Sequence, residues 1–445
     1  MSTTRRHFLG AAAGAGLAGA LHAQPQQNVG PNDRVRIALI GAGGQGSGDT
    51  RNSLAVGGVE LVAVSDIYDG RLKRAREVWG DQVFTTRDYR EVLARKDVDA
   101  IIIGTPDHWH STISIDAMNA GKDVYCEKPM VQQLAEGKQV IDAQNRTGRI
   151  FQVGSQRVSS VIYAKARELL HAGAIGELNM VEAWVDRNSA QGAWQYSIPP
   201  DAIPANIDWD RFLGHAPKVP FEPVRLFRWR NYRDYGTGVP GDLFVHLISG
   251  LHFVTGAIGP TRVYATGGLR FWKDGRDVPD VMVALYDYPQ RDRMPPFNVM
   301  YRVNFVDGAS ETSGLRFVGS EGIMQVDNAV TVSKVPRELE PGYSIDTFPK
   351  ALQEQFLKDY RQKYPQRPSV HTAQMSADEK FVPPKGYSDA FDHHRNFIGA
   401  VRSRKPVVED AVFGFRAAGP ALLSNISYFD KKVCLWDAEG MTLTG

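Results

Sequence analysis

The chain has 445 residues, 42% of them hydrophobic and 23% charged, so it is too long for one hydrophobic core and two domains are expected. This composition excludes a mostly disordered chain, a collagen-like fibre and a protein with many membrane spans. The whole chain has 52 basic and 50 acidic side chains, and its first 23 residues hold Arg5 and Arg6 and no acid. Without these 23 residues the chain has 50 side chains of each sign. Such a balance gives no bulk electrostatic reason to bind nucleic acid or anionic lipid.

The N-terminus has the pattern of an export signal of the twin-arginine type. Arg5 and Arg6 precede an apolar stretch rich in Ala and Gly, and Ala23 offers a cleavage site. This stretch of about a dozen residues is shorter than the roughly 20 that cross a bilayer. We therefore expect residues 1–23 to be a cleaved signal, residues 24–33 to be a polar linker, and the mature chain to be periplasmic or otherwise exported, without a membrane span. An uncleaved anchor and a frayed helical N-terminus are the alternatives.

Apolar, β-branched runs alternate with helical stretches between residues 34 and 154. Strands are predicted over 34–40, 60–65, 84–86, 100–104, 123–126 and 150–154. Helices are predicted from residues 44 and 69 and over 89–94, 110–120 and 133–147, with Asp88 as the N-cap of the third. This alternation is typical of a doubly wound parallel sheet, so the fold class is α/β and residues 34–154 are predicted to form a Rossmann domain.

The pattern changes after residue 155. A helix is predicted over 160–172, and long strand-like runs follow at 178–185 and 281–288. Residues 155–445 are therefore predicted to form a C-terminal α+β domain with an open, mostly antiparallel sheet. Residues 194–235 are rich in Pro, Trp, Tyr and Arg, which is too irregular for a sheet and too aromatic for a linker. We expect this stretch to be an ordered lid or pocket wall.

A G-x-G-x-x-G motif joins the first predicted strand to the first helix. Glycines in this context let the backbone turn tightly and approach a pyrophosphate at the helix N-terminus. Asp66 ends the second strand, twenty positions after the motif, where an acid accepts ribose hydroxyls and repels a 2′-phosphate. We therefore expect NAD, with NADP disfavoured; a merely tight turn and a helix cap at Asp66 are the alternatives. The motif residues expected to bind the cofactor are Gly41, Gly43, Gly44, Gln45 and Gly46.

Two further segments follow predicted strands of the same sheet. Thr105, Pro106 and His110 come after the fourth strand, and Glu127 and Lys128 after the fifth. Ligands of doubly wound sheets bind at the carboxyl ends of the strands, so both segments face one crevice. We expect Thr105, Pro106, His110 and Glu127 to contact the cofactor there, with His110 capping the helix that follows it.

Asp242 and His246 lie four residues apart in a helix-compatible run, so they are predicted to share one face. With G-x-G-x-x-G, T-P-x-x-x-H, E-K-P and D-x-x-x-H in this order, the chain resembles the Gfo/Idh/MocA oxidoreductases. The resemblance implies a Rossmann domain, a C-terminal domain whose open sheet often makes a homo-oligomer contact, and sugar- or cyclitol-like substrates. It also implies that Lys128 is the catalytic lysine, that His246 is the acid/base, and that Asp242 orients it and binds substrate. Ser249 departs from the acid that many relatives carry, which leaves one secondary substrate contact in doubt.

These roles agree with the chemistry of alcohol oxidation. The reaction needs an acceptor for the hydroxyl proton, and histidine has an ordinary pKa near 6.5, close to neutral pH. An ammonium at Lys128 would hydrogen-bond the substrate oxygen. The alternatives are a surface lysine beside a turn proline, and a helix N-terminal acid with a core histidine.

The substrate is expected to meet a segment that combines rings with forked donors. Arg228, Arg230 and Tyr235 lie in this segment, where rings stack on the apolar face of a pyranose and guanidinium groups bind its hydroxyls or an acid substituent. A structural aromatic cluster is equally compatible with any one residue. Gln156 and Arg157 follow the sixth strand and are predicted to border the same pocket.

The remaining histidines and cysteines carry weaker signals. His108 and His110 raise a metal site as the minor alternative, and we expect no metal. His393 and His394 are predicted to lie at a helix end, with contact to the substrate as the lesser alternative. Cys126 and Cys434 cannot form a disulfide framework, although one bridge between them stays open.

Export would separate the protein from any free nicotinamide pool. We therefore expect an NAD-dependent oxidoreductase of a small carbohydrate whose tightly held cofactor is recycled within the site. Three alternatives stay open: a redox-neutral glycosidase that oxidises, eliminates, hydrates and re-reduces; an ordinary sugar or cyclitol dehydrogenase that releases NADH; and a catalytically idle sugar-binding protein.

Overall fold

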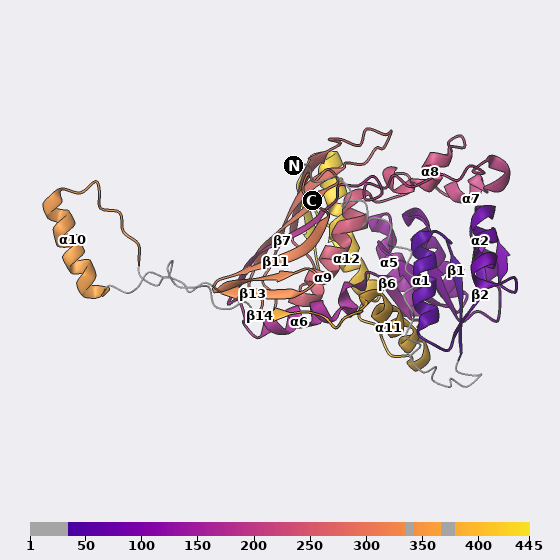
Figure 1. Cartoon of the computed structure of the whole chain (residues 1–445), viewed down its shortest axis with the longest axis horizontal. Coiled ribbons are helices and arrows are strands. Elements are labelled where there is room, and N and C mark those ends of the chain that lie inside the picture. The colour runs from indigo at the N-terminus through magenta and orange to yellow at the C-terminus, as the bar shows by residue number, and fades with distance from the viewer. Residues whose placement is uncertain (1–33, 335–340, 366–378) are drawn as a thin grey trace, which may run out of the picture.

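The computed structural model describes residues 34–334, 341–365 and 379–445. The predicted signal and linker, residues 1–33, lie outside the described residues. Two sheets organise the chain (Figure 1). No helix among the described ranges is long and apolar enough to cross a membrane. Cys126 and Cys434 are both buried and free, so no bridge joins them.

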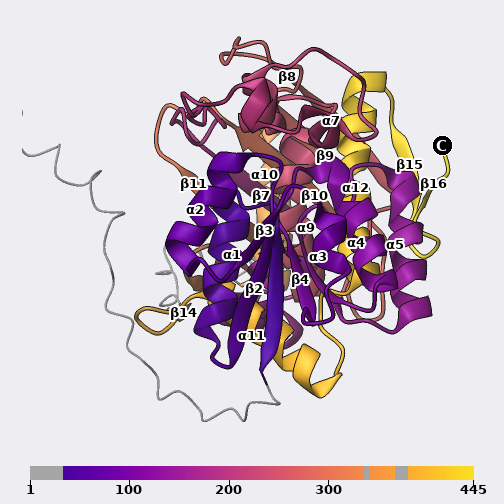
Figure 2. The ribbon, with the colours of Figure 1, turned by 90° about the vertical axis from the view of Figure 1, so that its right-hand side faces the viewer.

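A parallel sheet of six strands forms the first domain, in the order β3-β2-β1-β4-β5-β6. Its strands are β1 (Val35–Ile40), β2 (Val59–Ser65), β3 (Phe84–Thr86), β4 (Ala100–Ile103), β5 (Asp123–Glu127) and β6 (Phe151–Gly154). Its helices are α1 (Gly44–Ala55), α2 (Asp69–Trp79), α3 (Tyr89–Leu93), α4 (His110–Asn119) and α5 (Leu134–Thr147). Figure 2 shows these helices beside the sheet. The predicted Rossmann sheet is confirmed.

The apolar runs of the sequence become the buried strands of this sheet. All four residues of β4 are fully buried, because a central parallel strand is covered on both faces. The Asp88 carboxylate accepts a hydrogen bond from the backbone N–H of Arg90, which confirms the predicted N-cap of α3.

The second domain is built on a sheet of ten strands, in the order β14-β13-β12-β11-β7-β10-β9-β8-β15-β16. Its strands are β7 (Leu178–Asp186), β8 (Arg262–Gly268), β9 (Val281–Tyr288), β10 (Phe297–Asn304), β11 (Thr312–Gly319), β12 (Gly322–Val326), β13 (Val330–Lys334), β14 (Glu379–Phe381), β15 (Cys434–Asp437) and β16 (Thr442–Leu443). Among the described strands of this second sheet, only the pair β7–β10 is parallel, which confirms a mostly antiparallel sheet. The helices α6 (Val161–His171), α9 (Val245–Thr255) and α12 (Ala411–Asp430) pack against it. Another helix, α10 (Lys350–Lys363), stands apart from both sheets in Figure 1.

The end of the chain returns to the first domain. Helix α11 (Asp389–Ser403) packs against α1 and β1, and its Phe397 and Ile398 are fully buried in one core cluster with Ile37 and Leu39. Helix α12 contacts α5 and β6. The two domains are therefore held together by helices far along the chain from the Rossmann strands.

The aromatic stretch before residue 236 forms an ordered segment that we call the lid, residues 194–235. It carries the short helices α7 (Trp209–Leu213) and α8 (Pro223–Phe227), which lie over the carboxyl-end edge of the first sheet (Figure 1). The lid has its own small core, which includes Phe212 and Tyr235 and which Tyr68 of the first domain joins. The predicted pocket wall is thus a folded layer with its own apolar interior.

Candidate active site

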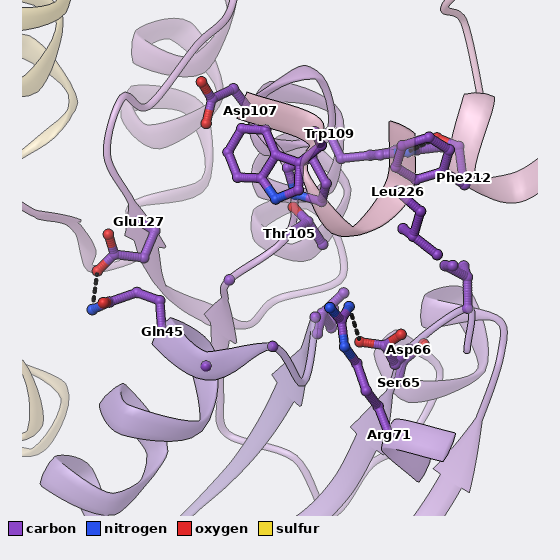
Figure 3. A pocket seen from close by; sticks show the side chains of 18 of the residues that line it. Gln45, Ser65, Asp66, Arg71, Thr105, Asp107, Trp109, Glu127, Phe212 and Leu226 are labelled. Carbon is purple, nitrogen blue, oxygen red and sulfur yellow. Dashed lines mark hydrogen bonds and ion pairs between the residues drawn. The ribbon is translucent and has the colours of Figure 1, made fainter. Parts of the chain in front are cut away.

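A cavity of about 460 Å³ lies between the carboxyl ends of the first sheet and the lid (Figure 3). Phe212, Leu226 and Trp109 bound it on one side, and Asp66 and Arg71 on the other. Eleven of the predicted site residues line it: Gly41, Gly43, Gly44, Gln45, Asp66, Thr105, Pro106, His110, Glu127, Lys128 and Arg230. The cavity therefore unites residues from the carboxyl ends of four strands, β1, β2, β4 and β5, with one arginine of the lid.

The glycines of the turn between β1 and α1 have two different roles. Gly41 has a φ of +90°, and a Cβ there would lie 2.6 Å from the backbone of Gly104 and Thr105. A Cβ on Gly46 would lie 2.3 Å from the carbonyl oxygen of Gly41, whereas one on Gly44 would meet nothing within 4 Å. Gly46 therefore allows α1 to pack against the turn, and Gly44 leaves open space at the start of α1. The backbone N–H groups at that start are available to an anion.

Asp66 is held rigidly at the end of β2. Its carboxylate accepts hydrogen bonds from the backbone N–H groups of Ala42 at 2.8 Å and Tyr68 at 3.0 Å, and Arg71 lies 3.4 Å away. A carboxylate has about four lone-pair sites, so acceptor capacity remains for ligand hydroxyls. The side chain lines the cavity where the predicted ribose would lie.

Lys128, Asp242 and Arg230 form a buried ion-pair cluster beside the cavity. The Lys128 Nζ lies 2.8 Å from Oδ1 of Asp242 and 2.9 Å from its backbone oxygen, and the Arg230 Nε lies 3.0 Å from the same Oδ1. Burial alone would raise the pKa of Asp242, but the charges of Lys128 and Arg230 outweigh it and hold the pKa below its ordinary value. Asp242 is therefore a carboxylate that orients two cations.

His246 lies beside this cluster. Its Nδ1 is 3.4 Å from the Ser155 hydroxyl. Burial, followed by the charges of Lys128 and Arg157, lowers the pKa of His246 well below 6.5, although Asp242 opposes them. The imidazole is therefore neutral near pH 7 and can accept a proton. The chain here is not one continuous α-helix: Asp242 lies in a π-helical turn, Pro240–Phe244, before α9 begins at Val245.

A buried acidic cluster that sequence reasoning missed extends from Gln45 and Glu127, on the cavity wall, to Asp49 behind it. Gln45 Nε2 lies 3.0 Å from Asp49 and 3.4 Å from Glu127, and His394 Nε2 of α11 lies 3.3 Å from Asp49. Burial raises the pKa of Asp49 to about 7, and burial together with the charge of Asp49 raises that of Glu127 well above its ordinary value. Burial and the neighbouring charge of Asp49 therefore favour the protonated form of Glu127. The spacing of Gln45 and Asp49, one helical turn apart, could have predicted that these two side chains interact. No local sequence pattern could have predicted the contact of His394 with Asp49.

The other predicted residues lie outside the cavity wall. Tyr235 is fully buried in the lid core, so it faces His108 and Phe212 and does not line the predicted substrate pocket. Arg228 donates to the backbone oxygen of Tyr196, and Arg157 lies 3.5 Å from Asp389. The predicted residues absent from the wall are Gly46, Gln156, Arg157, Arg228, Tyr235, Asp242 and His246.

His110 and His108 lie against backbone oxygens of neighbouring loops. Both ring nitrogens of His110 face backbone oxygens, of Pro129 at 2.7 Å and Thr105 at 2.9 Å, so the ring does not cap α4 as predicted. Nε2 of His108 faces the lid at the Phe212 oxygen. Burial lowers the pKa of both to about 4. Within residues 34–334, 341–365 and 379–445, no three His, Cys, Asp or Glu side chains gather as metal ligands. His393 bonds to Ser159 and the Val153 oxygen, and so ties α11 to the first domain.

The cavity fits a dinucleotide on grounds of its own. The Thr105 hydroxyl is buried on the wall without a hydrogen-bond partner. Open space at Gly44 adjoins the start of α1, and the Asp66 carboxylate lines the cavity beside the same turn, 2.8 Å from the backbone nitrogen of Ala42. A pyrophosphate would be held by the backbone of Gly43 and Gly44, and a ribose by Asp66.

Fold and site together define a two-domain protein in which a dinucleotide-binding domain meets an open-sheet domain at a cluster of lysine, aspartate and histidine. Residues 35–155 match the family model described as an oxidoreductase family, NAD-binding Rossmann fold, and residues 184–264 match its C-terminal alpha/beta domain. Both domains of the chain thus match domain models of the Gfo/Idh/MocA oxidoreductases, in agreement with the resemblance of its motifs, and the first domain matches the NAD-binding domain of that family.

Characterised relatives share part of the sequence. Inositol 2-dehydrogenase of Salmonella paratyphi B is 33% identical over 149 residues, which are 33% of this chain and 44% of the relative. Inositol 2-dehydrogenase 4 of Saccharopolyspora erythraea is 37% identical over 186 residues, 41% and 54% of the two chains. A glycosyl hydrolase family 109 protein of Shewanella is 33% identical over 211 residues, which cover 40% of this chain and 45% of the relative. The chain thus spans about half the length of these relatives.

Solved structures share the fold across nearly the whole chain. A levoglucosan dehydrogenase in complex with NADH and levoglucosan superposes with a TM-score of 0.63 at 17% identity, covering 90% of this chain and 98% of that one. A myo-inositol 2-dehydrogenase of Lactobacillus plantarum superposes with a TM-score of 0.61 at 19% identity, again covering 90% of this chain and 98% of that one.

Asp66→Asn should weaken NAD binding about ten- to a hundredfold, because a hydrogen bond to a charged group contributes about 1.5–3 kcal/mol. The loss should be smaller for NADP, since the carboxylate that repels a 2′-phosphate is gone and Arg71, 3.4 Å away, is released. Titration of nucleotide-free protein with each nucleotide measures both values. An unchanged NAD to NADP ratio would contradict the assignment.

Proposed function

We propose that this protein is an NAD-dependent oxidoreductase that removes hydride from a secondary alcohol of a sugar or cyclitol and recycles a tightly held nucleotide within its site. The observation that carries the proposal is the buried cluster of Lys128, Asp242 and Arg230, with His246 beside it, at the edge of the NAD-binding domain. When bound, NAD supplies the hydride acceptor.

The residues divide the remaining work. An ammonium has three N–H donors, and Lys128 directs two of them at Asp242, so one is left for a substrate hydroxyl. Asp242 fixes the ammonium and remains ionised. His246 is neutral near pH 7 and takes the hydroxyl proton as hydride leaves.

The lid supports slow release of the nucleotide. It is anchored to the first domain on both sides of the cavity: the Trp109 indole donates to the Phe212 oxygen at 3.0 Å, and the Asp208 N–H donates to the Ile67 oxygen at 2.9 Å. The Asp107 carboxylate accepts from the hydroxyl and N–H of Thr237, just beyond the lid. Release of a bound dinucleotide requires these contacts to part. Slow release suits an exported protein, and we propose export through the predicted twin-arginine signal.

Nucleotide retention is the test. Mature protein lacking residues 1–23 should release close to one NAD or NADH per chain when denatured after extensive dialysis. Little or no nucleotide would overturn the recycling mechanism and leave an NADH-releasing dehydrogenase.

Similarity to the Shewanella glycosyl hydrolase favours a redox-neutral glycosidase as the second candidate. Cleavage of a glycoside without net change in bound nucleotide would select it.

The pH dependence of turnover should reflect His246. Its pKa is lowered in the folded protein, so the neutral, proton-accepting form persists as pH falls through 6.5 and is lost only below the lowered value. The acidic limb of kcat/KM should therefore lie below pH 6.5. Burial is the largest cause of the lowered pKa; the charges of Lys128, Arg157 and Arg187 lower it further, and Asp242 raises it. A limb at or above 6.5 would exclude His246 as the base.

The outer face of the second sheet is the surface that we propose for self-association. Tyr264 and Leu285 are neighbours across β8 and β9, are 44% and 52% exposed, and adjoin Met300 of β10. Leu285→Glu should lower the mass measured by light scattering, because it places a charge within this apolar patch. Leu352→Glu, on exposed α10, should leave the mass unchanged. A monomeric wild-type protein would overturn the proposal.

A further inference from the structure

A second cleft, which we call the basal cleft, lies at the edge of the first sheet opposite the cavity. Its volume is about 1070 Å³, and its lining includes the amino ends of β1 and β5 and the loop before β4, whereas the cavity lies at the carboxyl ends of the strands. Strand β1 has six residues, so about 20 Å of strand separates the two edges. In Figure 2, α11 lies at the lower edge of this sheet and α7 at the upper edge. The basal cleft is therefore a surface distinct from the predicted nucleotide site.

The lining of the basal cleft is strongly basic. Seven of its side chains are cationic and three are acidic. The cations are Arg34, Arg36, Lys96, Lys122, Arg149, Arg402 and Arg404, and the acids are Glu60, Asp99 and Asp123. The near balance of charge over the whole chain therefore conceals a local excess of positive charge at this edge.

Two of the three acids are held by the fold. The Asp99 carboxylate accepts a hydrogen bond from the backbone N–H of Arg36 at 2.8 Å and lies 3.4 Å from the guanidinium of the same residue. Asp123 accepts a backbone N–H just before β6 at 2.9 Å and pairs with both Nη atoms of Arg404, at 2.5 and 3.0 Å. The ammonium of Lys122 donates to two backbone oxygens. These contacts fasten the starts of the strands and leave the other cations of the cleft unneutralised.

Four cations of the basal cleft have no acid as a partner. The side chains of Arg34 and Lys96 are exposed and form no hydrogen bond or ion pair with any described residue. Arg149 and Arg402 donate only to backbone oxygens of glycines. Glu60 is exposed and is the one acid of the lining that pairs with no described residue, so positive charge remains in excess.

We propose that the basal cleft docks the protein on a membrane surface that carries anionic phospholipids, with the headgroup phosphates bound by Arg34, Lys96, Arg149 and Arg402. Guanidinium and ammonium groups are the side chains that bind phosphate. Cations close to an anionic bilayer each add to binding, and their effect falls off within a Debye length. Docked in this way, the protein directs its cavity and lid away from the bilayer, toward soluble substrates.

Two observations favour a bilayer over other polyanions. Among the described residues that line the basal cleft none is aromatic, so the bases of a nucleic acid would find no ring to stack on. Arg34 is also the point at which residues 1–33 join the described chain, and the ten residues 24–33 can span at most about 35 Å between the cleft and the predicted signal. While the apolar stretch of that signal is at a bilayer, the cleft is held close to the same surface.

The experiment measures binding of the mature chain, residues 24–445, to vesicles, so that the apolar stretch of the signal does not contribute. Vesicles of phosphatidylcholine alone are compared by co-sedimentation with vesicles in which one lipid in three is phosphatidylglycerol. Binding to the mixed vesicles should be at least about tenfold stronger at low ionic strength, and added salt should weaken it, because salt screens exposed charges. Equal binding to both kinds of vesicle, or binding to neither, would overturn the proposal.

A double variant assigns the binding to the cleft. Arg34→Gln with Lys96→Gln should weaken binding to the mixed vesicles about twentyfold, about fivefold for each cation lost, and should keep the wild-type Tm. Lys273→Gln with Arg293→Gln is the matched control, because it removes the same charge from exposed loops of the second domain. The control should leave the binding unchanged. Equal losses in the two double variants would show that net charge and not the cleft attracts the lipid, and would overturn the proposal.

Tripolyphosphate and a single-stranded oligonucleotide test the other occupants by calorimetry. Saturable binding of either one by a protein that does not bind the mixed vesicles would overturn the membrane surface and assign the cleft to a soluble polyanion. Displacement of the protein from the mixed vesicles by tripolyphosphate would support headgroup phosphates as the group that the cleft binds. None of these measurements depends on turnover, so their outcome is separate from that of the proposed function.

Discussion

Lys128→Met should lower turnover by about a thousandfold while the protein stays folded and still binds NAD. The expected size is that of removing a positioned proton-transfer or charge-stabilising group. Asp242 keeps its second partner, Arg230, so the carboxylate remains paired when Lys128 is lost. Removing the lysine charge should also raise the pKa of His246, so the acidic limb of any residual activity should move to higher pH.

Lys122→Met is the matched control for this variant. Lys122 is also a buried lysine of the first domain, but its Nζ donates to the backbone oxygens of Arg95 and Val98, away from the cavity. Its loss should lower the free energy of unfolding by about 1–3 kcal/mol, because two buried acceptors lose their donor, without changing turnover of the folded protein. Turnover of Lys128→Met within tenfold of the wild type would remove Lys128 from the reaction.

Gly46→Ala should destabilise the first domain and abolish nucleotide retention. The new Cβ would lie 2.3 Å from the Gly41 oxygen and 3.0 Å from the Leu39 side chain, so α1 must move away from β1. Overpacking of this kind costs about 1–3 kcal/mol, and the displaced turn no longer presents its N–H groups to a pyrophosphate. Calorimetric Tm and the nucleotide content after dialysis are the two measurements.

Gly44→Ala is the matched control, because it makes the same glycine-to-alanine change at a position where the new Cβ meets no protein atom. A Cβ at Gly44 meets no protein atom within 4 Å, so Tm should stay close to that of the wild type. Any change in nucleotide content of this variant reports crowding of the ligand alone. Equal loss of Tm in the two variants would contradict the division of roles between Gly44 and Gly46.

The Rossmann strands were predictable because central parallel strands are covered on both faces and their sequences are uninterrupted apolar runs. The residues 100–103 illustrate this, since all four are fully buried. The loops after β4 and β5 could be placed at one crevice for the same reason, since strand direction fixes which ends meet. Lys128 and Asp242 were brought together by family resemblance, and the 2.8 Å contact agrees with it.

Other features depend on contacts that no local pattern encodes. His394 reaches Asp49 across 345 residues of chain, so the acidic cluster behind Glu127 was invisible to spacing arguments. The composition of the lid predicted that the segment is ordered, but not which of its side chains face the cavity. Tyr235 faces the interior of the lid instead. The run around Asp242 has helical periodicity, yet a π-helical turn alters the relation of Asp242 to His246.

Helix α11 has a consequence for how the protein is made. Phe397 and Ile398 complete the core that contains β1, so the NAD-binding domain lacks part of its interior until about nine-tenths of the chain has been synthesised. The growing polypeptide on the ribosome therefore cannot assemble the finished nucleotide site. A truncated product ending before residue 389 would therefore lack part of the core on which β1 and the turn after it rest.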